Sequence, residues 1–253
     1  VCEAARCPNK AECYAKNTAT FLILGNVCTR NCRFCNISGG TPQPPDPLEP
    51  QHVAQAIKDL NLKYAVITSV TRDDLPLQGA DVFRDVIIQT KKLVPQIKIE
   101  VLTPDFEGVH DLIDIVVDAK PDVLNHNIET VRKLYPKARP MAKYHRSLDF
   151  LAHAKERDPS MITKSGLMVG LGETFEELEQ TFFDLDAVGC DIVTVGQYMQ
   201  PSKKHLEVEK YYTEEDFEKI KSLAKKAGIK NIIASGLVRS SYRAFDAYST
   251  TTI

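Results

Sequence analysis

Residues 21–35 have the sequence FLILGNVCTRNCRFC, in which a short apolar run is followed at once by three cysteines. The apolar run predicts a buried strand, and Cys28, Cys32 and Cys35 are spaced C-x3-C-x2-C. Phe34 places an aromatic ring directly before the third cysteine. Reactive groups gather at the carboxyl ends of the strands in barrels of parallel strands, so we expect the chemistry in this loop.

The rest of the chain alternates apolar segments with amphipathic ones, which predicts a repeated strand–helix unit. The predicted strands cover residues 21–25, 64–70, 97–102, 123–128, 163–169, 192–199 and 232–234. Between them lie predicted helices, of which the one starting at Thr174 has a capping box with Glu177. Six such units, rather than eight, predict an α/β fold with a partial (β/α)6 TIM-like barrel that is open on one side.

The predicted organisation has three parts. Residues 1–13 form an N-terminal cluster-binding extension, residues 14–230 form the barrel, and residues 231–253 form a C-terminal segment. The chain starts at Val1 rather than at a methionine, so we expect that a segment has been removed from its N-terminus.

The N-terminal extension carries a second set of cysteines, Cys2, Cys7 and Cys13, spaced C-x4-C-x5-C. Three thiolates close in sequence are suited to hold one iron–sulfur cluster and leave a fourth iron for another ligand. A structural zinc site is the alternative, although zinc prefers four protein ligands, usually from two C-x2-C pairs. Disulfides require an oxidising compartment, and nothing in the sequence resembles a signal peptide.

Composition excludes other classes of protein. The chain has 253 residues, 32 of them basic and 34 acidic, and a net charge of -2, which argues against binding of nucleic acid through its phosphates. No apolar run approaches the roughly 20 residues of a membrane span. We therefore expect a cytoplasmic protein, or one of an organelle matrix if a targeting segment was removed.

The spacing C-x3-C-x-aromatic-C after the first strand resembles the signature of the radical S-adenosylmethionine superfamily. This resemblance implies that Cys28, Cys32 and Cys35 hold a [4Fe–4S] cluster whose free iron binds the methionine part of S-adenosyl-L-methionine. One electron, from a donor such as ferredoxin or flavodoxin, would then cleave the sulfonium and release a 5′-deoxyadenosyl radical. Phe34, within the motif, is expected to contact the cofactor.

A second pattern supports the same superfamily. Residues 166–173, GLMVGLGE, resemble its G-x-I-x-G-x-x-E pattern, with Met168 in place of isoleucine. The resemblance implies that Gly170, Gly172 and Glu173 belong to the adenine site; an ordinary strand-to-helix turn is the alternative.

Polar residues at the ends of other strands are further candidates for contacts with the cofactor or the substrate. Thr71 follows the second predicted strand, Asn127 and Glu129 end the fourth, and Lys164 begins the fifth. Contacts to the amino, ribose and carboxylate groups of the cofactor are expected there.

The chain as a whole is similar to the lipoyl synthase family, on the basis of both cysteine sets and of RSSY at residues 239–242. The resemblance implies that Cys2, Cys7 and Cys13 hold an auxiliary [4Fe–4S] cluster with Ser241 as its fourth ligand; Ser240 is the next candidate. Serine is a hard and therefore poor ligand for such a cluster. A weak ligand suits a cluster that is consumed as the source of sulfide.

The family resemblance implies a radical sulfurtransferase whose catalytic residues are Cys28, Cys32, Cys35 and Ser241. Two sulfur atoms would be inserted, at C6 and C8 of an octanoyl chain bound to a lysine of a carrier protein. The implied carriers are the H protein of glycine cleavage and the E2 acyltransferase subunits of 2-oxoacid dehydrogenases, with no nucleic-acid or membrane partner. Two alternatives stay open: another radical sulfur-inserting enzyme, such as a biotin-synthase-like protein or a methylthiotransferase, and a non-catalytic zinc protein.

Overall fold

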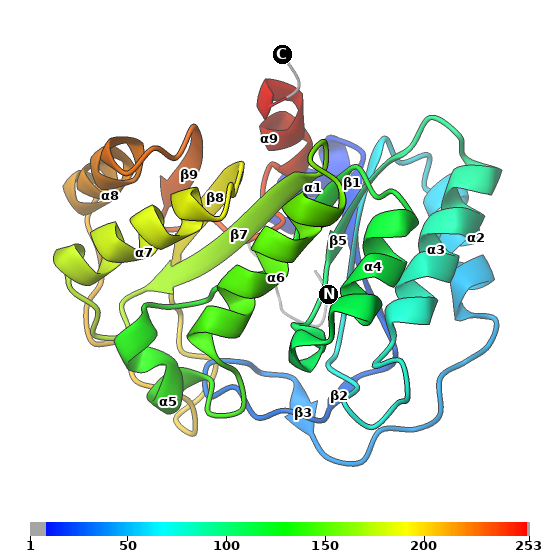
Figure 1. Cartoon of the computed structure of the whole chain (residues 1–253), viewed down its shortest axis with the longest axis horizontal. Helices are drawn as coiled ribbons and strands as arrows, with labels where there is room; N and C mark the ends of the chain where they lie inside the picture. Colours follow the sequence, from blue (N-terminus) through cyan, green and yellow to red (C-terminus); the bar gives the residue numbers. More distant parts are fainter. Residues whose placement is uncertain (1–8, 252–253) are drawn as a thin grey trace.

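The computed structural model describes residues 9–251. Within that range the main sheet consists of parallel strands that are neighbours in space in the order of the sequence, with β1 and β9 at its two edges (Figure 1). The strands of this sheet are β1 (Thr18–Ile23), β4 (Tyr64–Ser69), β5 (Lys98–Leu102), β6 (Val123–Asn125), β7 (Ile162–Val169), β8 (Ile192–Gln197) and β9 (Asn231–Ser235). The predicted open α/β barrel is confirmed.

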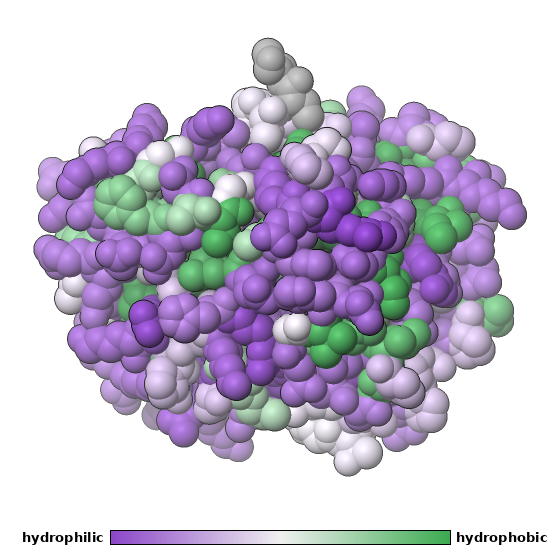
Figure 2. All heavy atoms as spheres, in the orientation of Figure 1, coloured by the Kyte–Doolittle hydropathy of each residue, from purple (hydrophilic) through white to green (hydrophobic). Residues whose placement is uncertain are grey.

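The helices that connect the strands lie on the outer side of the sheet (Figure 1). They are α2 (Glu49–Asp59), α3 (Ala80–Leu93), α4 (His110–Asp118), α6 (Tyr144–Arg157), α7 (Phe175–Ala187) and α8 (Glu214–Lys226). Figure 2 shows that the exposed surface of this helical layer is mostly hydrophilic, with separate apolar areas. None of the helices in the described residues has the length and apolar character needed to cross a membrane.

Shorter elements complete the fold. They are α1 (Lys10–Ala15), β2 (Val27–Cys28), β3 (Ser38–Gly39), η1 (Phe106–Gly108), η2 (Arg132–Leu134), α5 (Tyr135–Ala138) and α9 (Ala244–Thr251). Neither α1 nor α9 was predicted from the sequence, because both are short, at six and eight residues.

The core forms between the sheet and its helices. The first four residues of β4 are fully buried, as expected of a parallel strand that is covered on both faces. On α3, Phe83, Val86 and Ile87 are buried at helical spacing. The capping box of α7 is present as predicted: Glu177 N donates to Thr174 Oγ1 at 3.2 Å, and Thr174 N donates to a Glu177 carboxylate oxygen at 2.9 Å.

Strand β6 ends at Asn125, three residues earlier than the sequence predicts. The chain then crosses toward β7, where Ile128 N donates to Ser165 Oγ at 3.0 Å and Glu129 forms an isolated bridge with Leu167. Glu129 has a φ of 67°, a left-handed conformation that a non-glycine residue adopts only when its neighbours hold it there. This bulge places Asn127 and Glu129 at the carboxyl end of the sheet.

Helix α9 covers the opposite end of the barrel. Its residues Ala244, Phe245 and Tyr248 pack against Tyr64 and Val66, which begin β4. The ring centroids of Phe245 and Tyr248 lie 5.8 Å and 6.1 Å from that of Tyr64. Figure 1 shows α9 at the end of the molecule away from β2 and β3.

A buried ion pair lies inside the barrel, near α9. Lys164 Nζ is 2.9 Å and 3.0 Å from the two carboxylate oxygens of Glu100, and both side chains are at most 1% exposed. Tyr64 Oη and Asn125 Nδ2 donate to the same carboxylate at 2.9 Å and 3.0 Å. Buried charges need this number of partners because the desolvation cost is otherwise not offset.

We expect Lys164→Met to destabilise the fold by about 3–5 kcal/mol, because the variant leaves the Glu100 charge buried without its partner. Combining it with Glu100→Gln removes the unpaired charge and should restore most of the loss. Urea unfolding followed by circular dichroism measures both. A single variant as stable as the wild type would contradict this account.

Candidate active site

The loop that carries Cys28, Cys32 and Cys35 leaves the carboxyl end of β1 and is closed at its base by a small sheet. Cys28 in β2 lies opposite Gly39 in β3. The loop is joined to the end of β4 because Thr29 N donates to Thr71 O at 3.1 Å.

Inside the loop, Cys35 N donates to the Cys32 carbonyl at 3.1 Å, which makes a tight turn between these two thiols. Arg30 fixes the loop to the segments that follow β4 and β5: its Nε is 2.8 Å from Asp73 Oδ2 and its Nη1 is 2.7 Å from Asp105 Oδ1. Burial by itself would raise the pKa of Asp105, but the attraction of Arg30 holds that pKa below its usual value.

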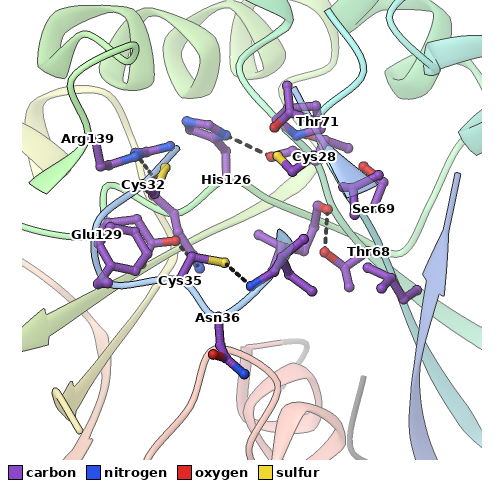
Figure 3. A pocket seen from close by; sticks show the side chains of 18 residues that line it. Cys28, Cys32, Cys35, Asn36, Thr68, Ser69, Thr71, His126, Glu129 and Arg139 are labelled. Atoms are coloured by element: carbon purple, nitrogen blue, oxygen red, sulfur yellow. Dashed lines mark hydrogen bonds between the residues drawn. The ribbon is translucent and has the colours of Figure 1, made fainter. Parts of the chain in front are cut away.

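The three cysteines line one cavity of about 410 Å³ at the carboxyl end of the sheet (Figure 3). Its other walls come mainly from residues at or just after the ends of β4, β5 and β6, together with Arg139 after α5. The polar members are Asn36, Thr68, Ser69, Thr71, Thr103, His126, Asn127, Glu129 and Arg139. The predicted contacts Phe34, Thr71, Asn127 and Glu129 are therefore brought together with the cysteines.

Arg139 is the buried cation of this cavity. Its Nη1 donates to Asn127 O at 3.0 Å and to Tyr135 Oη at 3.3 Å, and its side chain lies against the Cys32 thiol (Figure 3). Burial raises the pKa of the Glu129 carboxyl, and Arg139 and Asn127 oppose that rise. The site thus sets a fixed positive charge beside one thiol and one carboxyl group.

The thiols have altered acidity as well. Burial raises the pKa of Cys32, against the opposing attraction of Arg139, and burial raises the pKa of Cys35 to about 11. Thiolates, not thiols, are metal ligands, so Cys32 and Cys35 must lose their protons when they bind a metal centre. The positive charge of the bound metal favours that loss. The lone Cys190 is different: it is buried outside the cavity, and burial raises its pKa to about 12.

The polar groups of the cavity fit a ligand with amino, carboxylate and hydroxyl groups. Eight buried side-chain atoms of the described residues have no hydrogen-bond partner, and four of them belong to residues that line this cavity. These four are Ser69 Oγ, Thr103 Oγ1, Asn127 Oδ1 and Arg139 Nε. Buried polar atoms are nearly always paired, so four unpaired ones in one cavity indicate a place for a polar ligand.

A second cavity of about 840 Å³ adjoins the first, and Phe34, Asn36, Asn127 and Glu129 line both. It extends along the ends of β7 and β8 to the C-terminal segment. Its remaining wall residues are Gly166, Leu167, Met168, Thr194, Gly196, Gln197, Tyr198, Met199, Gln200, Pro201, Leu237, Val238, Arg239 and Ser240. One continuous lining thus runs from the cysteine loop to the RSSY segment.

Gly196 allows the C-terminal segment to lie this close to the sheet. A Cβ atom at this position would be 2.1 Å from Val238 O, which is backbone and has no room to move away. Val238 N also donates to Ser235 O at 3.1 Å, so the chain turns sharply after β9. A second turn follows, in which Tyr242 N donates to Arg239 O at 2.9 Å. Ser241 lies within this turn.

Helix α1, which carries Cys13, is fastened to the same segment. Glu12 accepts hydrogen bonds from Tyr242 Oη and Arg243 Nε, each at 3.1 Å, and Asn9 Nδ2 donates to Leu237 O at 2.7 Å. Cys13 and Arg243 line one small crevice. The structure therefore brings Cys13 beside the RSSY segment; Cys2 and Cys7 lie outside the described residues.

Lys164 lies elsewhere than the sequence predicts. It lines neither cavity, because its amino group is taken by Glu100 in the barrel interior. The sequence places Lys164 at the start of a strand, and side chains there lie at the end of the barrel away from the cysteines.

Gly170, Gly172 and Glu173 are also absent from the lining of both cavities. The Glu173 carboxylate accepts from Gly170 N at 2.6 Å and from Leu171 N at 3.0 Å, so it shapes the turn after β7. Gly170 has a φ of 104°, and a Cβ there would lie 2.6 Å from Lys210 O. The part of the glycine pattern that reaches the second cavity is Gly166 to Met168.

Sequence reasoning missed Arg139, Arg30 and His126. Arg139 and His126 line the first cavity, and Arg30 supports its cysteine loop. Arg30 lies within the cysteine motif, and His126 directly precedes the predicted contact Asn127, so the position of both residues in the sequence was a signal. Arg139 offered none, since it reaches the cavity only because α5 turns back toward the cysteine loop.

Among the described residues, no three His, Cys, Asp or Glu side chains are arranged to hold a single metal ion. Comparison with known proteins decides the class of cofactor. The model of the radical SAM superfamily matches residues 22–185. Lipoyl synthase of Caldanaerobacter subterraneus subsp. tengcongensis is 53% identical over 244 residues, which are 96% of this chain and 86% of that protein.

The chain belongs to the lipoyl synthase family. Lipoyl synthase of Aquifex aeolicus is 49% identical over 251 residues, 99% of this chain and 91% of the relative. As a member of this family the chain is a radical SAM sulfurtransferase that uses S-adenosylmethionine and [4Fe–4S] clusters. The alternative of a non-catalytic zinc protein is therefore wrong.

Solved structures share the fold. Streptococcus suis SuiB bound to S-adenosylmethionine superposes with a TM-score of 0.68 at 14% identity, covering 89% of this chain and 53% of that one. Methylornithine synthase, PylB, superposes with a TM-score of 0.58 at 15% identity, covering 92% and 76%. At these identities the likeness supports the open barrel alone.

His126 generates a prediction on pH. Nδ1 donates to Thr103 O at 2.9 Å, so Nε2 of the neutral ring accepts from Ser147 Oγ at 3.0 Å. Burial lowers the pKa of His126 to about 4, from 6.5. Between these values the unfolded chain binds more protons, so stability falls as pH falls.

We expect the His126 contribution to cost about 2 kcal/mol of unfolding free energy between pH 7.5 and pH 5. In His126→Gln this part of the pH dependence should disappear. Urea unfolding at both pH values measures it, and parallel pH profiles for the two proteins would refute the assignment.

Proposed function

We propose that this lipoyl synthase inserts sulfur at C6 and C8 of an octanoyl chain, using Cys28, Cys32 and Cys35 at one end of a shared cavity and the RSSY segment at the other. The supporting observation is the continuous lining from the cysteine loop, through Asn127 and Glu129, to Arg239 and Ser240. A substrate held in that space contacts both ends at once.

The first cavity is assigned to the radical-generating cofactors. When bound there, these groups would supply one-electron cleavage of S-adenosylmethionine to methionine and a 5′-deoxyadenosyl radical able to remove hydrogen from an unactivated carbon. The chain's own part is to bind and orient: Arg139 and Asn127 offer a cation and amide to the methionine part, and Ser69 and Thr103 offer hydroxyl groups.

Apolar side chains are suited to hold the octanoyl chain. Phe34 lines both cavities, and Leu167, Met168, Met199 and Leu237 line the second. Burial of the octanoyl chain there is favourable by roughly 0.8 kcal/mol for each CH₂ group. The same walls exclude water, which would otherwise compete for reactive intermediates.

The auxiliary cluster is assigned to Cys2, Cys7, Cys13 and Ser241. The fastening of α1 to the RSSY segment by Glu12 supports this set, because it brings Cys13 to the segment that contains Ser241. Ser240, which lines the second cavity, is the alternative ligand. A serine oxygen binds such a cluster weakly, which suits a cluster that gives up its sulfide.

Octanoylated carrier proteins are the substrates of this family. For this chain we propose the H protein of glycine cleavage and E2 subunits of 2-oxoacid dehydrogenases as carriers, ferredoxin or flavodoxin as electron donor, and the cytoplasm as location. The proposed functional division is residues 1–13 for the auxiliary cluster, 14–230 for the barrel and 231–253 for the RSSY segment, with the difference that β9 (Asn231–Ser235) pairs with β8 and is part of the barrel sheet.

The test of the function is a single-turnover assay with an octanoyl-lysine peptide, dithionite and protein whose cluster sulfide carries ³⁴S. We expect labelled sulfur at both C6 and C8, detected by mass spectrometry. Release of 5′-deoxyadenosine without labelled product would refute sulfur insertion while leaving the radical chemistry intact.

Ser241→Ala and Ser240→Ala form a matched pair. If Ser241 is the ligand, Ser241→Ala should lower lipoyl product at least 100-fold while still cleaving S-adenosylmethionine, because Cys28, Cys32 and Cys35 are unchanged. Ser240→Ala should keep most of the activity. The reverse order of effects would assign the ligand to Ser240.

A further inference from the structure

Basic residues are concentrated in one stretch of this nearly neutral chain. Residues 130–148 contain six lysines and arginines and no aspartate or glutamate. The stretch includes η2 and α5, and Arg139, buried in the cavity, is one of the six. Arg132, Lys133 and Lys137 are exposed on the outside.

The cysteine loop joins this stretch to a second basic segment. Arg33 lies between Cys32 and Phe34, and its backbone N donates to Ala138 O, at the end of α5, at 2.9 Å. Its carbonyl accepts from Leu206 N at 3.1 Å. Arg33 is thus bonded on one side to the basic stretch and on the other to the loop that contains Lys203 and Lys204.

The loop of residues 202–206 also contacts a cysteine directly. His205 Nε2 is 3.0 Å from Cys35 O, and His205 Nδ1 is 2.9 Å from Ser202 Oγ. A hydrogen-bonded route therefore leads from the backbone of Cys35 to the exposed turn with Lys203 and Lys204.

The exposed cations around Arg33 outnumber the carboxylates near them. We call Arg33, Arg132, Lys137, Lys203 and Lys204 the basic face; all five are exposed. Lys137 pairs with Glu209 at 3.2 Å, and Glu207 is a further exposed carboxylate. For the other four cations, no ion pair occurs among the described residues. The face therefore has a positive field beside the cysteine loop.

We propose that the basic face is the docking surface for an acidic one-electron donor protein, which reduces the cluster held by Cys28, Cys32 and Cys35. This inference rests on the proposed function, because the radical step there needs an electron from outside. Electron transfer falls off steeply with distance, so the donor must approach the cysteine loop closely. A positive surface at that point increases the rate of encounter with an acidic partner.

The octanoylated carrier is a less suitable occupant of this face. Its lipid arm must enter the second cavity, whose exposed apolar residues are Met199 and Leu237, 53% and 56% exposed. Gln200 and Pro201, directly before the loop of residues 202–206, line this cavity too, so it is reach that separates the two partners. The carrier can also act through a flexible arm, but an electron donor has no such reach.

The test uses the reconstituted two-cluster enzyme and the charge-reversal variant Lys203→Glu/Lys204→Glu. Lys58→Glu/Lys92→Glu, on α2 and α3, makes the same change of charge at exposed positions on the other side of the barrel (Figure 1). Reduction of the cluster by flavodoxin hydroquinone is followed by stopped-flow absorbance at low salt. We expect a 10- to 100-fold lower second-order rate constant for the first variant and less than a twofold change for the control.

Two further measurements separate the possible outcomes. With dithionite, which needs no docking, both variants should make lipoyl product at the wild-type rate. Added salt should slow flavodoxin reduction of the wild type more than that of Lys203→Glu/Lys204→Glu.

Equal flavodoxin rates for the two variants would overturn the proposal. A raised KM for an octanoylated carrier, with unchanged flavodoxin reduction, would overturn it and assign the face to the carrier instead. Failure of the proposed function is distinct, because it would show as a wild-type enzyme that makes no lipoyl product even with dithionite.

Discussion

The parallel pairing of neighbouring strands is the constraint on which the site depends. Each strand from β1 to β9 runs in the same direction as its neighbour, so all the segments that follow the strands meet at one edge of the sheet. The cysteine loop after β1, Thr71 after β4 and the bulge after β6 are far apart in sequence and line one cavity for this reason. The opposite end of the barrel has a structural role, with Lys164 and Glu100 paired in the interior and α9 packed over Tyr64.

The open edge of the barrel gives the C-terminal segment its position. Because β9 has no further strand beside it among the described elements, the chain can turn back across the end of β8. Gly196 provides the space for Val238, and the RSSY segment then forms part of the second cavity. Asn9 and Glu12, at the start of α1, bind this segment, so the two ends of the described chain meet beside the start of β1, at the end of the barrel away from β2 and β3. A closed barrel would leave no such place for a second group that faces the first.

The cavity combines polar and charged groups that are unfavourable in isolation. Arg139 is buried beside Cys32 and Glu129, and several polar atoms around it lack partners. Such an arrangement is costly in an unliganded protein and is compensated by ligands that complete the hydrogen bonds. The basic face outside this cavity has the opposite character: its cations are exposed to solvent, where they act at long range on partners rather than on the fold.

The sequence by itself determined the order and type of most elements, because helix and strand periodicities are local properties. It also determined the family, since both cysteine sets and the RSSY segment are contiguous patterns. Only the tertiary structure decided which polar residues reach the cavity. Lys164 was a plausible contact by position in sequence, but its place at the start of β7 sends it to Glu100; Arg139 had no signal, because the turn of α5 toward Arg33 brings it in. Strand β6 ended early for the same reason: hydrogen bonds to Ser165 and Gly166, far along the chain, overrode its local preference for an extended backbone.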